Sequence, residues 1–385
     1  MKKSPLLILF TTVFVDLLGF GIVIPISPYY AEKYGASGLE VGLLMSSYSL
    51  MQLIFSPFWG SLSDRIGRRP IILMSLLGSA ISYLIFGLAD SLSLLFISRL
   101  FAGIFGANIS TSQAYISDAT SAENRAKGMG LIGAAFGLGF VIGPFFGGFF
   151  SQFGYRVPAL VASGICALNF LSALINLPET EKRETKPREE TRKLGGIRSV
   201  FSAPILGTMV FLTFLITFAF SNLEATFALF AEKRYGFGSA ETGYLFGYIG
   251  IIMAVIQGGV VGRLASRFGE KNLLVAGTVA MLAGFFLIPL VSDFYLLLAA
   301  LALTGFGIGI NNPSLNSLIS KRSDPGAVGA VMGVSQSMGS LARILGPMCG
   351  GVLYDKLGTG YPYIGAGIVM AAAFVIASTM LKGIS

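Results

Sequence analysis

Residues 60–69 read GSLSDRIGRR: four charges and two glycines in ten residues, with a hydrophobic run of membrane-crossing length on each side. A short charged turn between two runs of about 20 apolar residues is typical of neighbouring transmembrane helices. A weaker copy, GRLASRFGEK, occupies residues 262–271, again between two hydrophobic runs. The two copies lie 202 residues apart, which indicates a duplicated membrane unit. Duplicated helical halves are common in carriers that rock between two states.

The composition excludes a soluble protein. The chain is 54% hydrophobic and only 12% charged, whereas a soluble domain carries about a quarter charged residues. The 50 glycines are typical of helices that pack closely in lipid. The chain has no histidine, which rules out a His-based metal site and a Ser-His-Asp triad. We expect no enzyme, no cofactor and no metal site, and we interpret Cys166 and Cys349 as packing residues of two spans.

Hydropathy predicts an all-α membrane protein with twelve spans. The expected spans are residues 5–30, 40–61, 70–89, 93–116, 127–150, 157–177, 201–224, 241–262, 272–291, 294–318, 328–351 and 362–381. With the N-terminus inside, the cytoplasmic segments hold 20 of the 27 Lys and Arg residues, the outer loops five and the spans two. This asymmetry follows the positive-inside rule. It predicts a multi-pass protein of the cytoplasmic (inner) membrane with both termini in the cytoplasm, and it explains the net charge of +8 without nucleic-acid binding.

The chain divides into two similar halves. Residues 1–177 form the expected N-terminal six-helix bundle and residues 201–385 the C-terminal one, while the polar segment 178–200 is a cytoplasmic linker that could end in a short amphipathic helix. Matching residues recur at an offset of 202 or 203 over more than eighty positions. Because six spans separate the copies, they have the same orientation and form parallel repeats.

The order of these motifs resembles the major facilitator superfamily over the whole chain. Residues 60–69 fit that superfamily's loop motif, and the fifth span fits its antiporter motif through Gly130, Gly139, Gly143-Pro144 and Gly147-Gly148. Arg99 matches the arginine of the fourth helix, and residues 16–25 match the first helix of the drug:proton antiporter branch. The resemblance is strongest to tetracycline exporters and their multidrug relatives, and it implies a fold of two pseudo-symmetric six-helix bundles.

The same resemblance bears on the substrate. Tetracycline exporters carry further membrane carboxylates in their third and ninth helices, and the matching positions here are Ser82 and Met281. This difference favours another amphipathic molecule over a tetracycline–metal complex.

Three ionisable residues within the spans are candidates for proton coupling: Asp16, Arg99 and Glu224. A carboxylate at mid-membrane costs about 2.5–3.5 kcal/mol on insertion scales, so Asp16 is expected to face the bundle interior and to exchange a proton or bind a cationic substrate. The alternative is a carboxylate that only ties two helices together. The resemblance implies that Arg99 acts on a nearby acid, the alternative being a fixed helix–helix tie. Glu224 is expected toward the outer end of the seventh span, as either a cavity carboxylate or an outer-surface residue, and its polar neighbours Ser221, Asn222 and Thr226 favour the cavity.

Other polar and aromatic residues of the spans are candidates for substrate binding, although some are expected only to join helices by hydrogen bonds. They are Tyr48, Gln52, Gln113, Asn222, Tyr244, Tyr248, Asn311, Asn312, Gln336 and Arg343. Arg343 could bind an anionic substrate group or pair with Glu224.

Two sets of residues are candidates for gating. The resemblance implies that Asp64 and Arg68 pair with Asp118, which would lock the halves in one state; a static staple of the loop is the alternative. In the fifth helix, Gly139 and Gly143 lie on one smooth face that permits sliding or simply tight packing, and Pro144 permits a bend.

The sequence thus favours a proton-coupled antiporter that exports small amphipathic or hydrophobic compounds by alternating access, a multidrug-type transporter. The alternative with the same fold is a symporter or uniporter that imports a small metabolite. A membrane sensor or enzyme is disfavoured, since no nucleotide loop or output domain is present. The expected partners are protons, a small-molecule substrate and the lipid bilayer, and we expect a monomer.

Overall fold

The computed structural model describes residues 5–107, 109–119, 122–179, 197–324 and 327–382, and these residues form helices and short connections without a strand. The helices of the N-terminal half are α1 (Pro5–Val23), α2 (Ser27–Glu32), α3 (Gly38–Ile66), α4 (Arg68–Leu88), α5 (Leu92–Phe105), α6 (Ile109–Ala119), α7 (Ala122–Ser151) and α8 (Arg156–Asn176). Those that follow are α10 (Ile197–Ser202), α11 (Pro204–Tyr235), α12 (Ser239–Val255), a π-helical turn (Ile256–Val260), α13 (Val261–Phe268), α14 (Glu270–Leu287), α15 (Phe294–Arg322), α16 (Val328–Leu357) and α17 (Tyr361–Lys382).

Eight of the described helices are long and apolar enough to cross a membrane, and three shorter apolar helices lie at residues 8–23, 92–105 and 137–151. With broken helices counted as single spans, the helices form the expected twelve spans. The all-α membrane fold predicted from hydropathy is therefore confirmed.

The chain forms two compact units. Unit 1 comprises residues 1–36, 43–184 and 237–247, and unit 2 comprises residues 37–42, 185–236 and 248–385. The boundary falls inside α3 and inside α12, so the first turns of each helix belong to one unit and the rest to the other.

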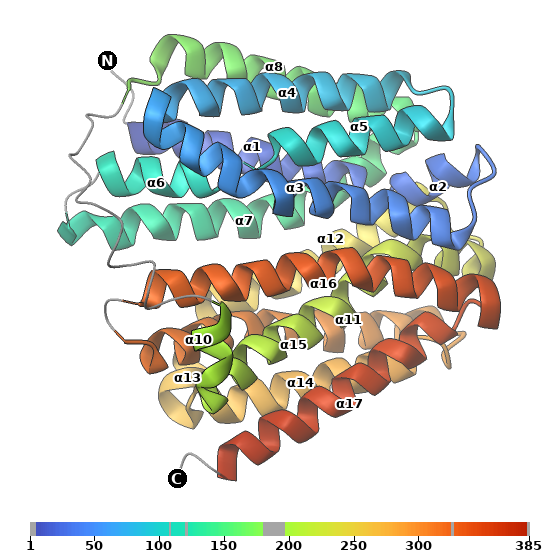
Figure 1. The fold of residues 1–385 in the computed structure, drawn as a ribbon. Coiled ribbons are helices and arrows are strands. Elements are labelled where there is room, and N and C mark those ends of the chain that lie inside the picture. The colour runs from blue at the N-terminus through green and yellow to red at the C-terminus, as the bar shows by residue number, and fades with distance from the viewer. Residues whose placement is uncertain (1–4, 108, 120–121, 180–196, 325–326, 383–385) are drawn as a thin grey trace. The chain divides into compact units, whose positions relative to one another are not determined.

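Both units use the same set of helix pairs. In unit 1, α1 packs on α7, and α4 packs on α8 and α5; Figure 1 shows α4, α5 and α8 side by side. In unit 2, α11 packs on α16, and α14 packs on α17 and α15. These are the first and fifth, third and sixth, and third and fourth spans of each half. The pairing agrees with the internal repeat seen in the sequence.

Two expected spans are broken where hydropathy predicts continuous helices. The first breaks at residues 24–26, where Pro25 has no N–H to donate, and the Ser27 hydroxyl bridges the break by donating to the carbonyl of Val23 at 2.7 Å. The fourth breaks after Gly106, whose N–H still donates to Ala102 O at 2.7 Å. Hydropathy misses both breaks because the residues that flank them are apolar.

The seventh helix is longer than expected. It runs from Pro204 to Tyr235 and ends at Gly236, which has a φ of 70°, a conformation that favours glycine. Glu224 therefore lies eleven residues before the helix end and not at its outer end, which corrects the expectation from sequence. The expected end at residue 224 is wrong because the helix continues through the charged residues 232–234.

The segment between the halves is described in part. α10 lies at residues 197–202, near the expected end of the linker. Residues 180–196 lie outside the described part of the chain.

Candidate functional site

Asp16 lies in the interior of unit 1. The residue is on α1 and only 7% exposed, and the hydroxyl of Ser79 on α4 donates to its Oδ1 at 3.0 Å. A carboxyl group buried in this way is stabilised by hydrogen bonds and not by water. The helix pair α1–α4 therefore holds an acid where protein surrounds it.

Arg99 is buried in the same unit, and no ion pair with a carboxylate is found for it among the described residues. The side chain is 3% exposed, and its guanidinium carbon lies 5.2 Å from the ring centre of Tyr48 and 5.9 Å from that of Phe86. Its Nε and Nη2 atoms have no hydrogen-bond partner among the described residues. Aromatic faces stabilise a guanidinium, but they do not accept its N–H bonds. Two strong donors of Arg99 are thus available to an acceptor that moves toward them.

Tyr48 and Gln52 lie at the break of the fourth span. Gln52 Nε2 donates to the carbonyl of Gly106 at 3.1 Å and lies 3.4 Å from the Tyr48 hydroxyl. A broken helix frees backbone carbonyls, and in a membrane these need protein partners. Gln52 supplies such a partner beside the Arg99–Tyr48 contact. The structure thus brings together three candidates that the sequence named separately.

Ser79 and Tyr83 were not singled out from the sequence. Both are buried, and they lie four residues apart on one face of α4. Tyr83 packs on α1 so closely that a Cβ on Gly19 would lie 2.6 Å from its ring. It also lies within electrostatic range of Asp16, Tyr48, Arg99 and Cys166. No spacing in the sequence identifies these residues, because hydroxyl-bearing side chains are common in membrane helices.

In unit 2, Glu224 and Arg343 are the charged candidates. Glu224 on α11 and Arg343 on α16 are half-buried, and the two charges attract each other. The Arg343 Nη2 atom also donates to Ser340 Oγ at 3.3 Å. Their helices pack tightly here, since a Cβ on Gly346 would lie 2.3 Å from Ser221 Oγ. The pairing of Arg343 with Glu224, which the sequence left open, stays a prediction.

Two amide candidates of unit 2 join helices. Asn222 Nδ2 on α11 donates to the carbonyl of Pro362 on α17 at 3.2 Å. Asn311 Nδ2 on α15 donates to the sulfur of Met281 on α14 at 3.4 Å. Both residues are at most 1% exposed. These contacts favour a packing role over substrate contact for both amides.

The remaining substrate candidates are dispersed. Tyr244 belongs to unit 1, where its hydroxyl and Gln152 Nε2 lie 2.7 Å apart, whereas Tyr248 is half-buried in unit 2. In unit 2, Asn312 is half-buried on α15 and Gln336 is exposed on α16. Gln113 lies on α6, but its side chain falls outside the described part of the chain.

The loop motif forms a compact charge cluster in unit 1. Arg68 Nη1 lies 2.6 Å from Asp64 Oδ1, and Arg68 Nε lies 3.1 Å from Asp118 Oδ2. Arg68 also donates to Ser63 Oγ at 2.6 Å. One arginine therefore connects the end of α3 to α6. The planar guanidinium bridges two carboxylates through different nitrogen atoms, which the single ammonium group of lysine cannot reproduce.

Glu179 extends this cluster and was missed from the sequence. Its Oε1 accepts the backbone N–H of Arg68 at 2.9 Å and that of Arg69 at 3.2 Å. These are the first amides of α4, where the positive end of the helix dipole favours a carboxylate. Glu179 lies 111 residues from Arg68 in the chain, so only the folded structure reveals the contact.

The glycine face of α7 packs directly on α1. A Cβ on Gly139 would lie 2.7 Å from Leu17 Cβ, and one on Gly143 would lie 2.7 Å from the Cα of Gly21. Pro144 lies within an unbroken α7 and touches the same Gly21. Any larger side chain would force the helices apart. The antiporter-type glycines thus place α7 against the helix that carries Asp16.

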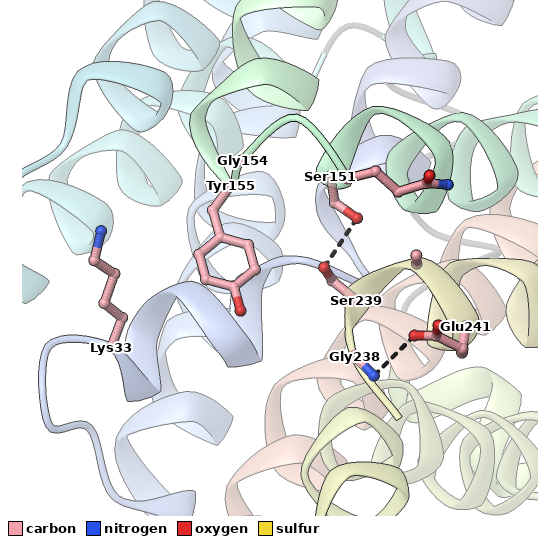
Figure 2. A pocket seen from close by; sticks show the side chains of 9 residues that line it. Lys33, Ser151, Gly154, Tyr155, Gly238, Ser239 and Glu241 are labelled. Carbon is pink, nitrogen blue, oxygen red and sulfur yellow. Dashed lines mark hydrogen bonds between the residues drawn. The ribbon is translucent and has the colours of Figure 1, made fainter. Parts of the chain in front are cut away.

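Unit 1 also contains a pocket of about 370 Å³ at the ends of its helices, shown in Figure 2. Its lining includes Lys33, Tyr155 and the pair Ser151 and Ser239, whose hydroxyls lie 2.9 Å apart. Glu241 accepts the N–H of Gly238 at 2.9 Å beside it. None of the candidate site residues lines this pocket. Within the described residues, no group of three or more His, Cys, Asp or Glu could hold a metal ion.

Comparison with known proteins places this arrangement in context. The family model described as Major Facilitator Superfamily matches residues 9–260 and 258–383. The class B tetracycline resistance protein of Escherichia coli is 32% identical, covering 89% of this chain and 86% of that protein. Multidrug resistance protein 2 of Bacillus subtilis (strain 168) is also 32% identical, covering 96% and 93%. The crystal structure of the human organic anion transporter MFSD10 (TETRAN) is similar with a TM-score of 0.72 and 26% identity, covering 98% of this chain and 99% of that chain.

Proposed function

Since the chain belongs to the major facilitator superfamily and is a multi-pass membrane transporter of small molecules, we propose that it is a proton-coupled antiporter that exports small amphipathic or hydrophobic compounds. It would work by alternating access in a cytoplasmic-type membrane, with both termini in the cytoplasm. The curated relatives named above are resistance proteins, which supports export.

The observation that carries this proposal is the burial of Asp16. It is a carboxyl group 7% exposed on a membrane helix, with a hydroxyl donor at 3.0 Å. An intramembrane acid of this kind is costly and typically marks an ion or proton pathway. Protonation removes its charge, and substrate binding would then alternate with proton binding.

The glycine face of α7 supports coupling of this acid to movement. Because Gly139 and Gly143 have no side chains and bring the α7 backbone against α1, a shift of one helix acts directly on the other. Packed interfaces with two discrete arrangements are the usual way in which a local change is transmitted. Asp16 lies one residue before Leu17, which is part of this contact.

The available driving force is sufficient for export. One charge that crosses 100 mV is worth about 2.3 kcal/mol, which supports about a fortyfold gradient of a neutral substrate. A single exchanged proton is therefore enough for useful extrusion.

The substrate class follows from the residues that are present. The third-helix and ninth-helix positions that carry carboxylates in tetracycline exporters are Ser82 and Met281 here. Ser82 donates to its own helix at Gly78 O, 2.6 Å away, and Met281 is fully buried against Asn311. With neither carboxylate present, an amphipathic compound without a bound metal is the favoured substrate. The Glu224–Arg343 pair could select for its charge.

The proposal is tested in inside-out membrane vesicles with an acidic lumen. We expect the wild type to accumulate at least one member of a panel of amphipathic cations, anions and neutral compounds, and to release protons as it does so. Asp16→Asn should abolish both effects. Asp90→Asn, the same change at an exposed turn between α4 and α5, should leave them intact.

Two results would contradict this proposal. Accumulation that an acidic lumen prevents and an alkaline lumen drives would show import by symport. Accumulation that persists in Asp16→Asn would remove Asp16 from the coupling step.

A further inference from the structure

Tyr83 lies on a face of α4 that is close to two buried charged residues of unit 1, Asp16 and Arg99. Ser79 and Tyr83 lie on one face of α4, and the Ser79 hydroxyl already bonds Asp16 at 3.0 Å. The Tyr83 ring rests on Gly19, three residues beyond Asp16 on α1. Phe86, one turn further along α4, lies under the guanidinium of Arg99. The same helix face therefore contacts both the acid and the arginine.

Four ionisable groups within electrostatic range of Tyr83 come from four other helices. They are Asp16 on α1, Tyr48 on α3, Arg99 on α5 and Cys166 on α8, and all four act on it electrostatically. Asp16 is the carboxylate among them and Arg99 the cation. The Tyr83 side chain is 3% exposed, so water does not screen these interactions as it would at a surface.

We infer that the Tyr83 hydroxyl is a positioning group that connects Arg99 to Asp16, so that the protonation of Asp16 is transmitted to Arg99. When Asp16 is ionised, the Tyr83 hydroxyl donates to the carboxylate and accepts from the Arg99 Nε or Nη2 atom. When Asp16 is protonated, the hydrogen bonds of the Tyr83 hydroxyl to Asp16 and Arg99 break. A phenol can donate and accept a hydrogen bond at the same time. When an ion stands at each end of a series of hydrogen bonds, each bond in the series becomes stronger.

The state described here agrees with the form in which the Tyr83 hydrogen bonds are broken. Arg99 Nε and Nη2 are buried and have no acceptor among the described residues, which is costly unless an acceptor arrives in another state. Asp16 receives the Ser79 hydroxyl. The inference rests on the proposed proton coupling at Asp16 and adds the residue through which Arg99 acts.

The test measures the protonation of Asp16 directly. Infrared spectra of the purified protein across a pH series contain a protonated-carboxyl band that Asp16→Asn removes, and its midpoint pH is followed. Loss of a hydrogen bond to a charged group corresponds to about one pH unit. We expect Tyr83→Phe to shift the midpoint by about one unit toward higher pH, because the ionised carboxylate loses a donor. Tyr30→Phe is the control, since that buried hydroxyl bonds the carbonyl of Ala89, and it should cause no shift.

A double-mutant cycle tests the connection to Arg99. Arg99→Gln should raise the midpoint in the wild-type background and should have a clearly smaller effect in the Tyr83→Phe background. Equal shifts in the two backgrounds, or an unchanged midpoint in Tyr83→Phe, would overturn the inference. If Tyr83→Phe does not yield folded protein, two other variants replace it. Tyr83→Gln keeps a hydrogen-bond donor and Tyr83→Met does not, so only Tyr83→Met should shift the midpoint.

The failure of this inference differs from the failure of the proposed function. Wild-type vesicles that transport without proton exchange would reject the coupling itself. Proton exchange that is retained together with an unchanged midpoint in Tyr83→Phe would reject only the role of Tyr83.

Discussion

The interiors of units 1 and 2 are built on the same helix pairs but carry different chemistry. In unit 1, the first, third and fourth spans bring together Asp16, Ser79, Tyr83 and Arg99. The positions that follow at an offset of 202 or 203 residues in unit 2 are all apolar, namely Ala219, Met281, Phe285 and Ala302. Duplication therefore preserved the packing and not the polar cluster.

Unit 2 has its charges on another helix pair. Glu224 and Arg343 lie on α11 and α16, the seventh and eleventh spans. The positions that precede them by 203 residues in unit 1 are Gly21 and Phe140. Gly21 is the residue on which the α7 glycines pack. Together with the proposed function, the contrast leads us to propose a division of work, with proton exchange in unit 1 and substrate recognition in unit 2.

The sharpest test of this division compares two neutralised acids. Asp16→Asn should lower proton-driven transport at least about a hundredfold, because it removes the exchangeable proton. Glu224→Gln should retain proton exchange and change which compounds are transported. Both variants are assayed in proteoliposomes with the same panel and a pH-sensitive dye in the lumen. If both variants lost proton exchange a hundredfold, or if neither did, the proposed division between the units would be wrong.

A second test concerns the packing that the two units share. Gly143→Val in unit 1 and Gly346→Val in unit 2 should each destabilise the protein by about 1–3 kcal/mol, because the added atoms meet neighbouring atoms and overpack the contact. A Cβ at these positions would lie 2.7 Å from Gly21 Cα and 2.3 Å from Ser221 Oγ. The melting temperature in detergent reports the effect.

The matched control for packing is Gly164→Val on α8, where a Cβ would meet nothing within 4 Å. It should melt close to the wild type. If Gly143→Val also melts at the temperature of the wild type, α1 and α7 are not in fixed contact in unit 1.

A third test concerns the charged loop, whose repeat copy at residues 262–271 lacks the aspartate: Ser266 stands where unit 1 has Asp64. Asp64→Asn should lower the transport rate about fivefold while substrate affinity changes little, because the bond to Arg68 biases one conformation over another. Flux and equilibrium binding are measured on the same preparation. Equal losses in transport rate and in substrate affinity would favour a purely structural role for this loop.

The smallest expected effect concerns Glu179. Glu179→Gln should destabilise the start of α4 by about 0.3–1 kcal/mol, since the carboxylate charge at the first amides is lost. Amide exchange of Arg68 and Arg69 should become faster. Asp90→Asn serves as the control, and identical exchange in all three proteins would show that the charge of Glu179 contributes nothing there.

The sequence predicted the spans well, and it identified two of the buried charged residues as candidates. Hydropathy identifies lipid-crossing segments because burial in lipid requires about 20 apolar residues. It does not show where a helix continues into charged residues, as α11 does to Tyr235, or where it breaks, as at Gly106. Asp16 and Arg99 were conspicuous as charges within spans.

Other parts of the site have no signal in the sequence. Ser79 and Tyr83 have ordinary side chains whose role depends on facing Asp16 across a helix contact. Glu179 becomes part of the loop cluster only through a contact across 111 residues. Asn222 and Asn311 could not be assigned from the sequence to substrate binding or to helix packing, and their hydrogen bonds to α17 and α14 favour packing.

The central claim is that Asp16 gives up its proton when a substrate binds. The most direct measurement is the release of protons into weakly buffered solution when a transported compound is added to the purified protein, repeated at a series of pH values across the midpoint of the Asp16 carboxyl band. We predict release approaching one proton per protein from the wild type as pH falls below that midpoint, since proton and substrate binding are linked, and none from Asp16→Asn. Equal release from both proteins, or substrate binding to the wild type without release at any pH, would contradict the account.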